Sequence, residues 1–237
     1  MIVPLNEIET LKHKRILIHG QPGSGKTLFS CISQKHRIGI IDIDRGLTTV
    51  QSWIAKHPEK KYLSPVVSQP KTIAEFEKDY TAMLKNPDID IVVIDTLSEY
   101  QRFFIAEKTG TKNYTDQRDW GDLLVDLEDI CKEAERSNKH CIFTCHTGKS
   151  FDPVSDTEVL SATFQGRFGE FYTRHFDLIG FLSWSVKTKL VGGQKTNEVE
   201  RKIIFSPSPN VRTKDRTNKL TTEEPNLDTI LAKILGE

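Results

Sequence analysis

The sequence lacks an overall charge, because its 33 Lys and Arg residues balance its 33 Asp and Glu residues. No global electrostatic field therefore argues for or against nucleic acid, and a charged partner has to be recognised by a local patch. Apolar runs long enough to cross a membrane are also missing, and the N-terminal stretch is interrupted by Pro4 and by charged residues. We therefore expect a protein with no membrane partner.

Cysteine is scarce, and the four residues Cys31, Cys131, Cys141 and Cys145 do not form the paired CxxC spacing of a zinc site. Cys141, Cys145 and His146 lie close together and look like metal ligands at first sight. The apolar stretch CIFTCH, however, places both thiols on one face of a strand, which favours buried free cysteines. This cysteine usage predicts a reducing, cytoplasmic environment.

Apolar runs of strand length alternate with stretches that suit helices, which is typical of a mostly parallel sheet flanked by helices. Beyond residue 175 the pattern changes to the alternation of antiparallel strands joined by a glycine turn. We predict one α/β domain over residues 1–237. The predicted strands are Arg15–His19, Arg37–Ile43, Ile89–Ile94, His140–Cys145, Phe176–Thr188 and Glu198–Phe205; the predicted helices run from the Gly-rich segment to about Gln34 and over Ile73–Leu84, Trp120–Ser137 and Asn226–Leu235.

The segment GQPGSGKT, from Gly20 to Thr27, fits the pattern G-x-x-x-x-G-K-[ST] and lies between a predicted strand and a predicted helix. Glycines allow backbone N–H groups to turn towards phosphates, and the helix directs its positive N-terminus at them. Lys26 is expected to reach the β- and γ-phosphates, and the Thr27 hydroxyl to bind Mg²⁺. The sequence therefore predicts an ATP and Mg²⁺ site formed by Gly20, Gly23, Ser24, Gly25, Lys26 and Thr27.

Carboxylates end two of the predicted strands. Asp95 closes IVVID, where it can hold Mg²⁺ together with Thr27. Asp42 and Asp44 in IIDID would project to the same side of a strand, and Asp44 lies nearer the end at which ligand sites form. Asp44 is our candidate for activating the attacking water, with Glu99 as the alternative base.

The order of these motifs, followed by a strand that ends in His146, resembles the RecA-like ATPase core, a group that includes RecA-type recombinases and KaiC-like ATPases. The resemblance implies ATP hydrolysis to ADP and phosphate, with Asp44 in the place where relatives usually carry a glutamate. The side chain of aspartate is one methylene shorter than that of glutamate, and this difference affects the rate of ATP hydrolysis that Asp44 can support. The resemblance also implies that His146 senses the γ-phosphate.

Near the C-terminus, Lys214 and Arg216 alternate on what is expected to be a final strand and would point the same way. In RecA-like proteins such a pair reaches the ATP of the neighbouring subunit and neutralises charge on the transferred phosphoryl group. The resemblance thus implies a head-to-tail homo-oligomer, either a ring or a filament. Residues 1–12 are then a segment for contact with a neighbour, and residues 221–237 a C-terminal tail and helix.

Two stretches combine cations with aromatic residues, as single-strand nucleic-acid binding requires. The first is Lys108–Trp120 and the second is Thr147–Arg174. The aromatic residues are Tyr114, Trp120, Phe151, Phe164, Phe168, Phe171 and Tyr172, of which Phe171, like Phe176 beyond the stretch, is an alternative core residue. The candidate DNA-binding cations are Lys108, Lys112, Arg118, Lys149, Arg167 and Arg174.

Over most of its length the chain resembles small phage-encoded RecA-like ATPases that are single-strand annealing proteins of the Sak type. The shared segments are GQPGSGKT, IDID, IVVIDT, GRFGEFYTRHFD and KDR. The resemblance implies an ATP-dependent single-stranded DNA-binding protein of recombination in a bacterial host cytoplasm, with a single-strand DNA-binding protein as a further partner. The alternative is a KaiC-like or helicase-loader-like ATPase that acts on a protein partner, and a small-molecule kinase is a third, weaker hypothesis.

Overall fold

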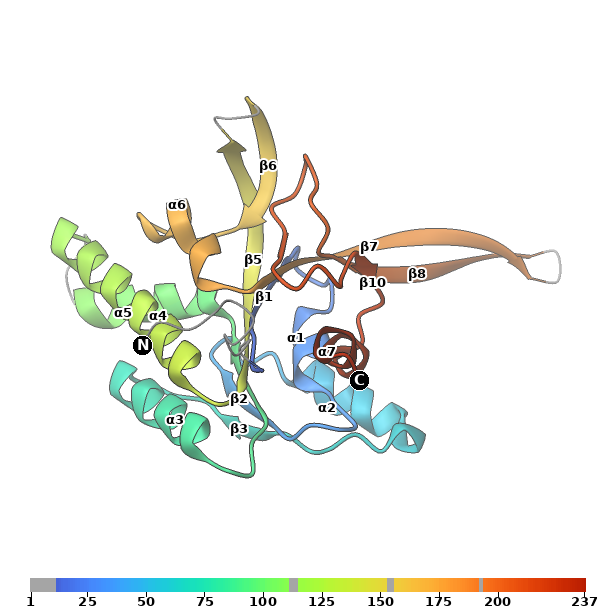
Figure 1. Cartoon of the computed structure of the whole chain (residues 1–237), viewed down its shortest axis with the longest axis horizontal. Coiled ribbons are helices and arrows are strands. Elements are labelled where there is room, and N and C mark those ends of the chain that lie inside the picture. The colour runs from blue at the N-terminus through green and yellow to red at the C-terminus, as the bar shows by residue number, and fades with distance from the viewer. Residues whose placement is uncertain (1–11, 111–114, 153–155, 192–193) are drawn as a thin grey trace, which may run out of the picture.

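The computed structural model describes residues 12–110, 115–152, 156–191 and 194–237. A large sheet runs through the molecule in the order β10-β8-β7-β1-β5-β4-β2-β3, with β6 paired to β5 and β9 paired to β7 (Figure 1). The strands are β1 (Arg15–Gly20), β2 (Ile38–Asp42), β3 (Val66–Ser68), β4 (Ile91–Asp95), β5 (His140–Asp152), β6 (Thr157–Ala162), β7 (Leu178–Val191), β8 (Gln194–Ile204), β9 (Lys214–Asp215) and β10 (Thr222–Glu223). The helices are α1 (Lys26–Cys31), α2 (Thr48–Lys56), α3 (Ile73–Lys85), α4 (Leu97–Thr109), α5 (Gln117–Arg136), α6 (Phe168–Phe171) and α7 (Leu227–Leu235), with short 3-10 turns η2 (Pro58–Lys60) and η3 (Tyr172–His175).

The centre of the sheet is parallel: β1 pairs in parallel with β5 and β7, and β4 pairs in parallel with β5 and β2. Pairing becomes antiparallel from β7 onwards, where β8, β9 and β10 join. The predicted fold class is therefore confirmed: an α/β fold of the RecA-like P-loop type, with a mostly parallel central sheet and antiparallel strands in the C-terminal part.

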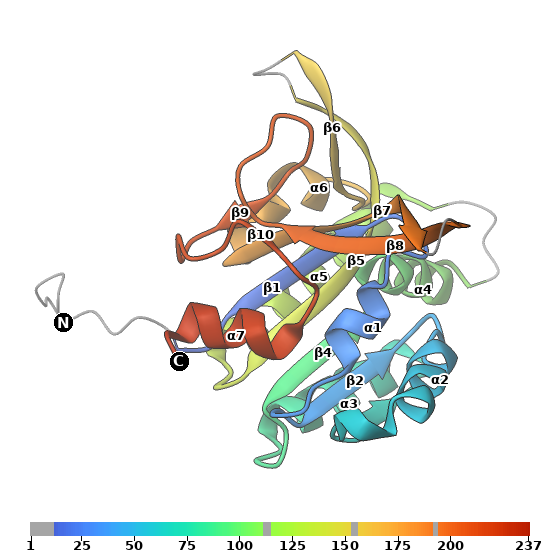
Figure 2. The ribbon, with the colours of Figure 1, turned by 90° about the vertical axis from the view of Figure 1, so that its right-hand side faces the viewer.

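Helices cover both faces of the sheet, and each face has its own apolar core (Figure 2). On one face, side chains of α3, α4 and α5, such as Phe76, Tyr100 and Leu127, pack against the strands. On the other, α1, α2 and α7 contribute residues that include Phe29 and Leu231. The central strands are buried on both sides, which explains their continuous apolar sequence.

Several elements differ from the sequence prediction. The helices α2 and α4 and the edge strand β3 were not predicted; α2 buries only Val50, so its apolar pattern is too weak to detect. The predicted final strand around residues 211–216 is only the two-residue β9. Strand β5 does not end at Cys145 but continues to Asp152 and turns back as β6. Residues 1–12 were expected to contact a neighbouring subunit, and all of them except Lys12 lie outside the described residues.

Two hairpins project from this body in different directions (Figure 1). One is formed by β5 and β6, and the other by β7 and β8, which pair from Phe181 to Val191. Both hairpins extend strands whose inner halves belong to the core. No helix in the described part of the chain is long and apolar enough to span a bilayer.

Candidate nucleotide site

The predicted phosphate loop joins the end of β1 to the start of α1, as the sequence prediction required. Gly23 and Gly25 have φ angles of 75° and 104°, a region that residues with a Cβ rarely adopt. Gly20 is required for a different reason, because a Cβ there would lie 2.5 Å from the carbonyl oxygen of Leu182. The loop therefore depends on glycine both for its turn and for its contact with β7.

Lys26 points into this loop. Its Nζ donates hydrogen bonds to the carbonyl oxygens of Gly20 and Gln21, at 2.8 and 3.2 Å. The side chain is buried, and burial lowers the pKa of Lys26 although Asp95 and Asp44 oppose the shift. Charged phosphate oxygens are stronger acceptors than neutral carbonyls, so a bound nucleotide offers this ammonium group better partners.

Three carboxylates meet beside the loop. Asp42, Asp44 and Asp95 each place a carboxylate oxygen within 4.8 Å of the others, because β2 and β4 are adjacent and Asp42 pairs with Asp95. Burial, followed by the nearby Asp95, raises the pKa of Asp44 to about 6. Asp42 is buried and accepts hydrogen bonds from Gln69 Nε2 at 2.7 Å and from the Gly46 N–H. Asp44 is thus the member of the group that faces the solvent.

The residues fit a magnesium ion at Asp95. This side chain is fully buried and burial raises its pKa, while Oδ1 accepts a hydrogen bond from Thr144 and the nearby Thr27 hydroxyl opposes the pKa shift. Its Oδ2 has no hydrogen-bond partner in the described residues. An orphaned buried carboxylate oxygen beside a threonine hydroxyl is the donor set that a hard cation prefers. Thr27 and Asp95 would hold Mg²⁺, which when bound neutralises charge on the phosphate chain.

His146 lies between the phosphate loop and Asp95, because β5 is inserted between β1 and β4 and His146 pairs with Gly20. Its Nδ1 is buried without a hydrogen-bond partner in the described chain, and its Nε2 lies 3.5 Å from Glu99 Oε1. His146 therefore lines the cavity at the position predicted for a γ-phosphate sensor, with its Nδ1 enclosed by the protein. Glu99, the alternative base, lies beside this histidine.

A cavity of about 750 Å³ connects these groups. Lys26, Thr27, Asp44 and His146 line it, as do residues that the sequence did not single out: Trp53 of α2, Val199 and Arg201 of β8, and residues 224–228, which lead into the first turn of α7. Arg201 Nε donates a hydrogen bond to the carbonyl oxygen of Ser24 at 3.1 Å. No sequence signal marks Arg201, since only the register of β8 places it beside a loop 177 residues earlier.

Lys214 and Arg216 lie at the opposite end of β1. Strand β9 pairs with Leu178, which pairs with Ile16 near the start of β1, whereas the phosphate loop follows Gly20. Lys214 Nζ donates to the carbonyl oxygens of Thr173 and Phe176, at 2.6 and 2.7 Å. Burial, followed by Arg216, lowers the pKa of Lys214 to about 8.

Arg216 forms an ion pair with Asp177 at 3.2 Å, so both residues contact the same segment, as their alternation predicted. Both cationic groups have partners within their own chain, and the expected final strand is only the two-residue β9, which leaves out Arg216 and corrects that expectation. Both residues thus lie away from the phosphate loop of their own chain.

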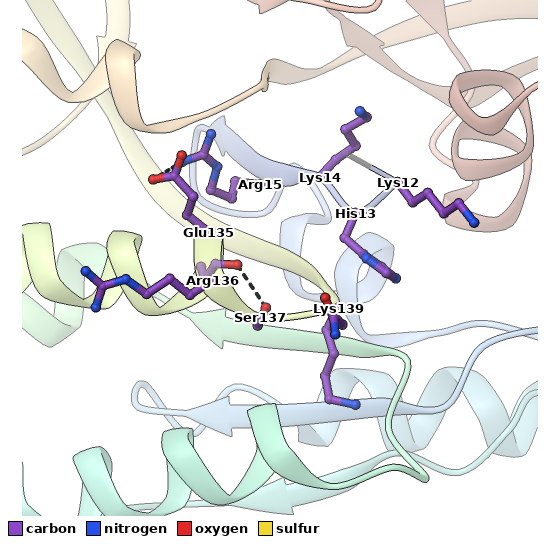
Figure 3. A pocket seen from close by; sticks show the side chains of 10 residues that line it. Lys12, His13, Lys14, Arg15, Glu135, Arg136, Ser137 and Lys139 are labelled. Carbon is purple, nitrogen blue, oxygen red and sulfur yellow. Dashed lines mark hydrogen bonds and ion pairs between the residues drawn. The ribbon is translucent and has the colours of Figure 1, made fainter. Parts of the chain in front are cut away.

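A second cavity, of about 550 Å³, lies near this end of the sheet between the start of β1 and the end of α5 (Figure 3). Its cations do not converge on one point: Lys12 and Lys14 point away from each other in Figure 3. Arg15 forms an ion pair with Glu135 at 3.1 Å, and Lys139 donates to the carbonyl oxygens of Asn86 and Ile89. The cavity is basic, but its charges are largely occupied by the fold.

The candidate DNA-binding cations are spread over three regions. Lys108 lies 3.5 Å from Asp122 and above the Phe104 ring, and Arg174 forms an ion pair with Glu128 at 2.7 Å. Arg118 and Arg167 are exposed. Lys149 is exposed on the β5–β6 hairpin and pairs with Glu158 at 2.7 Å. Lys112 and Tyr114 lie outside the described residues.

Most of the aromatic residues predicted to stack on bases belong to the core instead. Phe164, Phe168, Phe171 and Tyr172 pack on one another, with ring centroids 4.9 to 5.9 Å apart. They extend the core cluster formed with α5, and Trp120 packs against the same cluster. Phe151, on the β5–β6 hairpin, is the exception, with 61% of its surface exposed.

The four cysteines are free and buried, as predicted. Cys141 and Cys145 share one face of β5 within a core cluster, and burial raises the pKa of both thiols, to about 12 and about 11. Among the described residues, the grouping of potential metal ligands is the three aspartates, and it does not include these thiols.

The match to a protein family agrees with this geometry. A family model described as an AAA domain matches residues 12–217, which is most of the chain. No curated protein matches the sequence. Among solved structures, a prototypical ATPase from the type III secretion system of pathogenic bacteria is similar, with 16% sequence identity and a TM-score of 0.47. The similarity covers 72% of this chain and 51% of that one, so this chain spans about half the length of that structure.

Proposed function

The chain belongs to the AAA domain family of P-loop ATPases, and we propose that it binds single-stranded DNA in its ATP-bound state and promotes strand annealing or pairing in phage or prophage recombination. ATP and Mg²⁺ would occupy the cavity beside the phosphate loop, with Asp44 as the base that activates water. In this proposal the β5–β6 hairpin, formed by residues 147–152 and 157–162, is the main DNA contact.

One observation carries the proposal: strand β5 runs without interruption from the nucleotide cavity into this hairpin. His146 lines the cavity, and three and five residues later Lys149 and Phe151 are exposed on the projecting part of the strand. A contact between the γ-phosphate and the imidazole of His146 would therefore act on the strand that carries both groups. A cation for the backbone and an aromatic ring for a base are the parts that sequence-tolerant single-strand binding needs.

Fluorescence anisotropy with a labelled oligonucleotide tests this proposal, with and without a non-hydrolysable ATP analogue. We expect ATP-dependent binding that weakens with salt, because phosphate contacts release counterions. Loss of one stacked base costs about 1–3 kcal/mol, so Phe151→Ala should weaken binding about tenfold or more. Trp184→Ala, on the other hairpin, is the matched control and should bind as the wild type does.

Absence of binding at low salt in the presence of the analogue would contradict the DNA proposal. It would leave the ATPase in place and favour the second candidate function, an ATPase that acts on a protein partner. The observation in favour of that candidate is the β7–β8 hairpin, where Trp184, Val186 and Val199 are each about half exposed on one face. Such an apolar stripe is typical of protein contact.

We further propose that the protein assembles head to tail, with Lys214 and Arg216 acting on the ATP of the neighbouring subunit. Their position, remote from their own phosphate loop, supports this arrangement. Arg216→Ala should spare ATP binding by the isolated chain but reduce hydrolysis per subunit by about tenfold or more at protein concentrations that allow assembly. ATPase rates measured over a series of protein concentrations check this, and a wild-type rate per subunit independent of concentration would contradict it.

A further inference from the structure

The phosphate loop touches the base of the β7–β8 hairpin at two glycines. A Cβ at Gly20 would meet the Leu182 carbonyl oxygen of β7 at 2.5 Å, and a Cβ at Gly25 would meet Arg201 Nε of β8 at 3.3 Å. The hairpin is therefore a wall of the nucleotide cavity; its backbone leaves no room for a side chain at Gly20, and the end of the Arg201 side chain packs closely over Gly25.

Arg201 is the charged part of this contact. It lies opposite Trp184 in the hairpin and lines the cavity together with Lys26 and Thr27. Its Nε donates to the Ser24 carbonyl oxygen at 3.1 Å. Within the described residues its two terminal nitrogens have no hydrogen bond or ion pair, so the planar donor face of the guanidinium remains available.

We propose that Arg201 is a second cation of the nucleotide site, which donates to the phosphate chain of the nucleotide bound to its own subunit. The inference rests on the nucleotide site proposed above, but not on DNA binding or on assembly. Like Lys26, Arg201 now contacts a neutral carbonyl of the loop. A guanidinium offers two parallel donors that match phosphate oxygens, and a charged acceptor forms the stronger bond.

This role connects the nucleotide to the β7–β8 hairpin. Arg201 and Trp184 are paired residues at its base, and the apolar stripe of Val186 and Val199 continues from them towards the tip. A phosphate that holds Arg201 would fix the base of the hairpin against the phosphate loop. Trp184 should therefore report nucleotide binding through its fluorescence.

Titration with a fluorescent ATP analogue tests the proposal on the isolated chain without DNA. Arg201→Gln keeps an amide donor for the Ser24 carbonyl but removes the charge, and we expect its dissociation constant to rise about tenfold. Arg37→Gln is the matched control, since it makes the same change at an exposed arginine that pairs with Asp88 at 3.7 Å, at the end of β2 opposite to Asp42. Its affinity should equal that of the wild type.

A second readout uses Trp184 itself, in a background with Trp53→Phe and Trp120→Phe. Addition of ATP should change its emission in this background, and Arg201→Gln should abolish the change at saturating ATP. If Arg201 only stabilises the empty loop, Arg201→Gln should leave ATP affinity unchanged or raise it. In the variant, the bond between Arg201 and the Ser24 carbonyl no longer has to be broken when ATP binds. That result would overturn the proposal, while loss of binding in Lys26→Ala would still show that the nucleotide site is correct.

Discussion

Lys26→Ala is expected to remove measurable ATP binding, with a rise in dissociation constant of about a hundredfold or more. Lys26 is buried at the base of the cavity and its ammonium group already lies within the phosphate loop. A charge-assisted hydrogen bond from Lys26 to phosphate is worth about 1.5–3 kcal/mol of binding free energy. Because the site is buried, loss of the ammonium group also leaves the negative charge of the phosphate without a compensating charge. Titration of the variant with a fluorescent ATP analogue measures the effect.

The matched control for this substitution is Lys78→Ala, which removes an exposed lysine of α3 on the other side of the sheet. Its ATP affinity should not change. Thermal melting of both variants separates lost binding from lost folding, because Lys26 also bonds the carbonyls of Gly20 and Gln21 in the empty loop. Wild-type affinity in a folded Lys26→Ala protein would contradict the assignment of the site.

Asp177→Ala is expected to lower the free energy of unfolding by about 3–5 kcal/mol, the usual cost of removing one partner of a buried ion pair. Asp177 accepts three hydrogen bonds from Arg15, from its backbone N–H, Nε and Nη2, at 3.0 to 3.2 Å. Both side chains are buried. The pair fastens the start of β1, the strand that ends in the phosphate loop, to the segment that enters β7. Urea denaturation measures the loss.

Asp88→Ala is the matched control, because its pair with Arg37 at 3.7 Å is exposed and should contribute about 0–1 kcal/mol.

The pH dependence of the free energy of unfolding gives a second check on the pair of Asp177 with Arg15. Burial alone would raise the pKa of Asp177, but the hydrogen bonds from Arg15 outweigh it and hold the pKa below its usual value. The stabilisation is therefore complete above about pH 4 and is lost as the pH falls through the lower folded-state pKa. The difference between wild type and Asp177→Ala should narrow in acid, and equal effects of the two substitutions at neutral pH would contradict the prediction.

The residues that could be predicted from the sequence are those whose role depends on local order along the chain. The phosphate loop is contiguous in sequence. The positions of its glycines, Lys26 and Thr27 follow from a strand, a turn and a helix that succeed one another along the chain. Asp44, Asp95 and His146 were predictable for a related reason. The carboxyl ends of parallel strands meet at one edge, so polar residues that end such strands come together there.

The tertiary structure decided the features that depend on pairing between distant segments. Arg201 reaches Ser24 only because β8 adds to the sheet beside β7, and nothing in the local sequence distinguishes it from other arginines of an exposed strand. The aromatic residues between 164 and 172 look like a stacking surface in sequence, yet packing against α5 makes them core. Polarity and spacing along this segment do not specify which of its side chains meet α5.

The amino-acid sequence by itself determined the nucleotide site and the α/β class, because both follow from short-range periodicity and from one contiguous motif. The structure alone decided what surrounds that site: the β5–β6 hairpin that leaves it at His146, the β7–β8 hairpin that closes it with Arg201, and the remote position of Lys214 and Arg216. These arrangements follow from strand order and register, which are set by contacts between residues far apart in the chain.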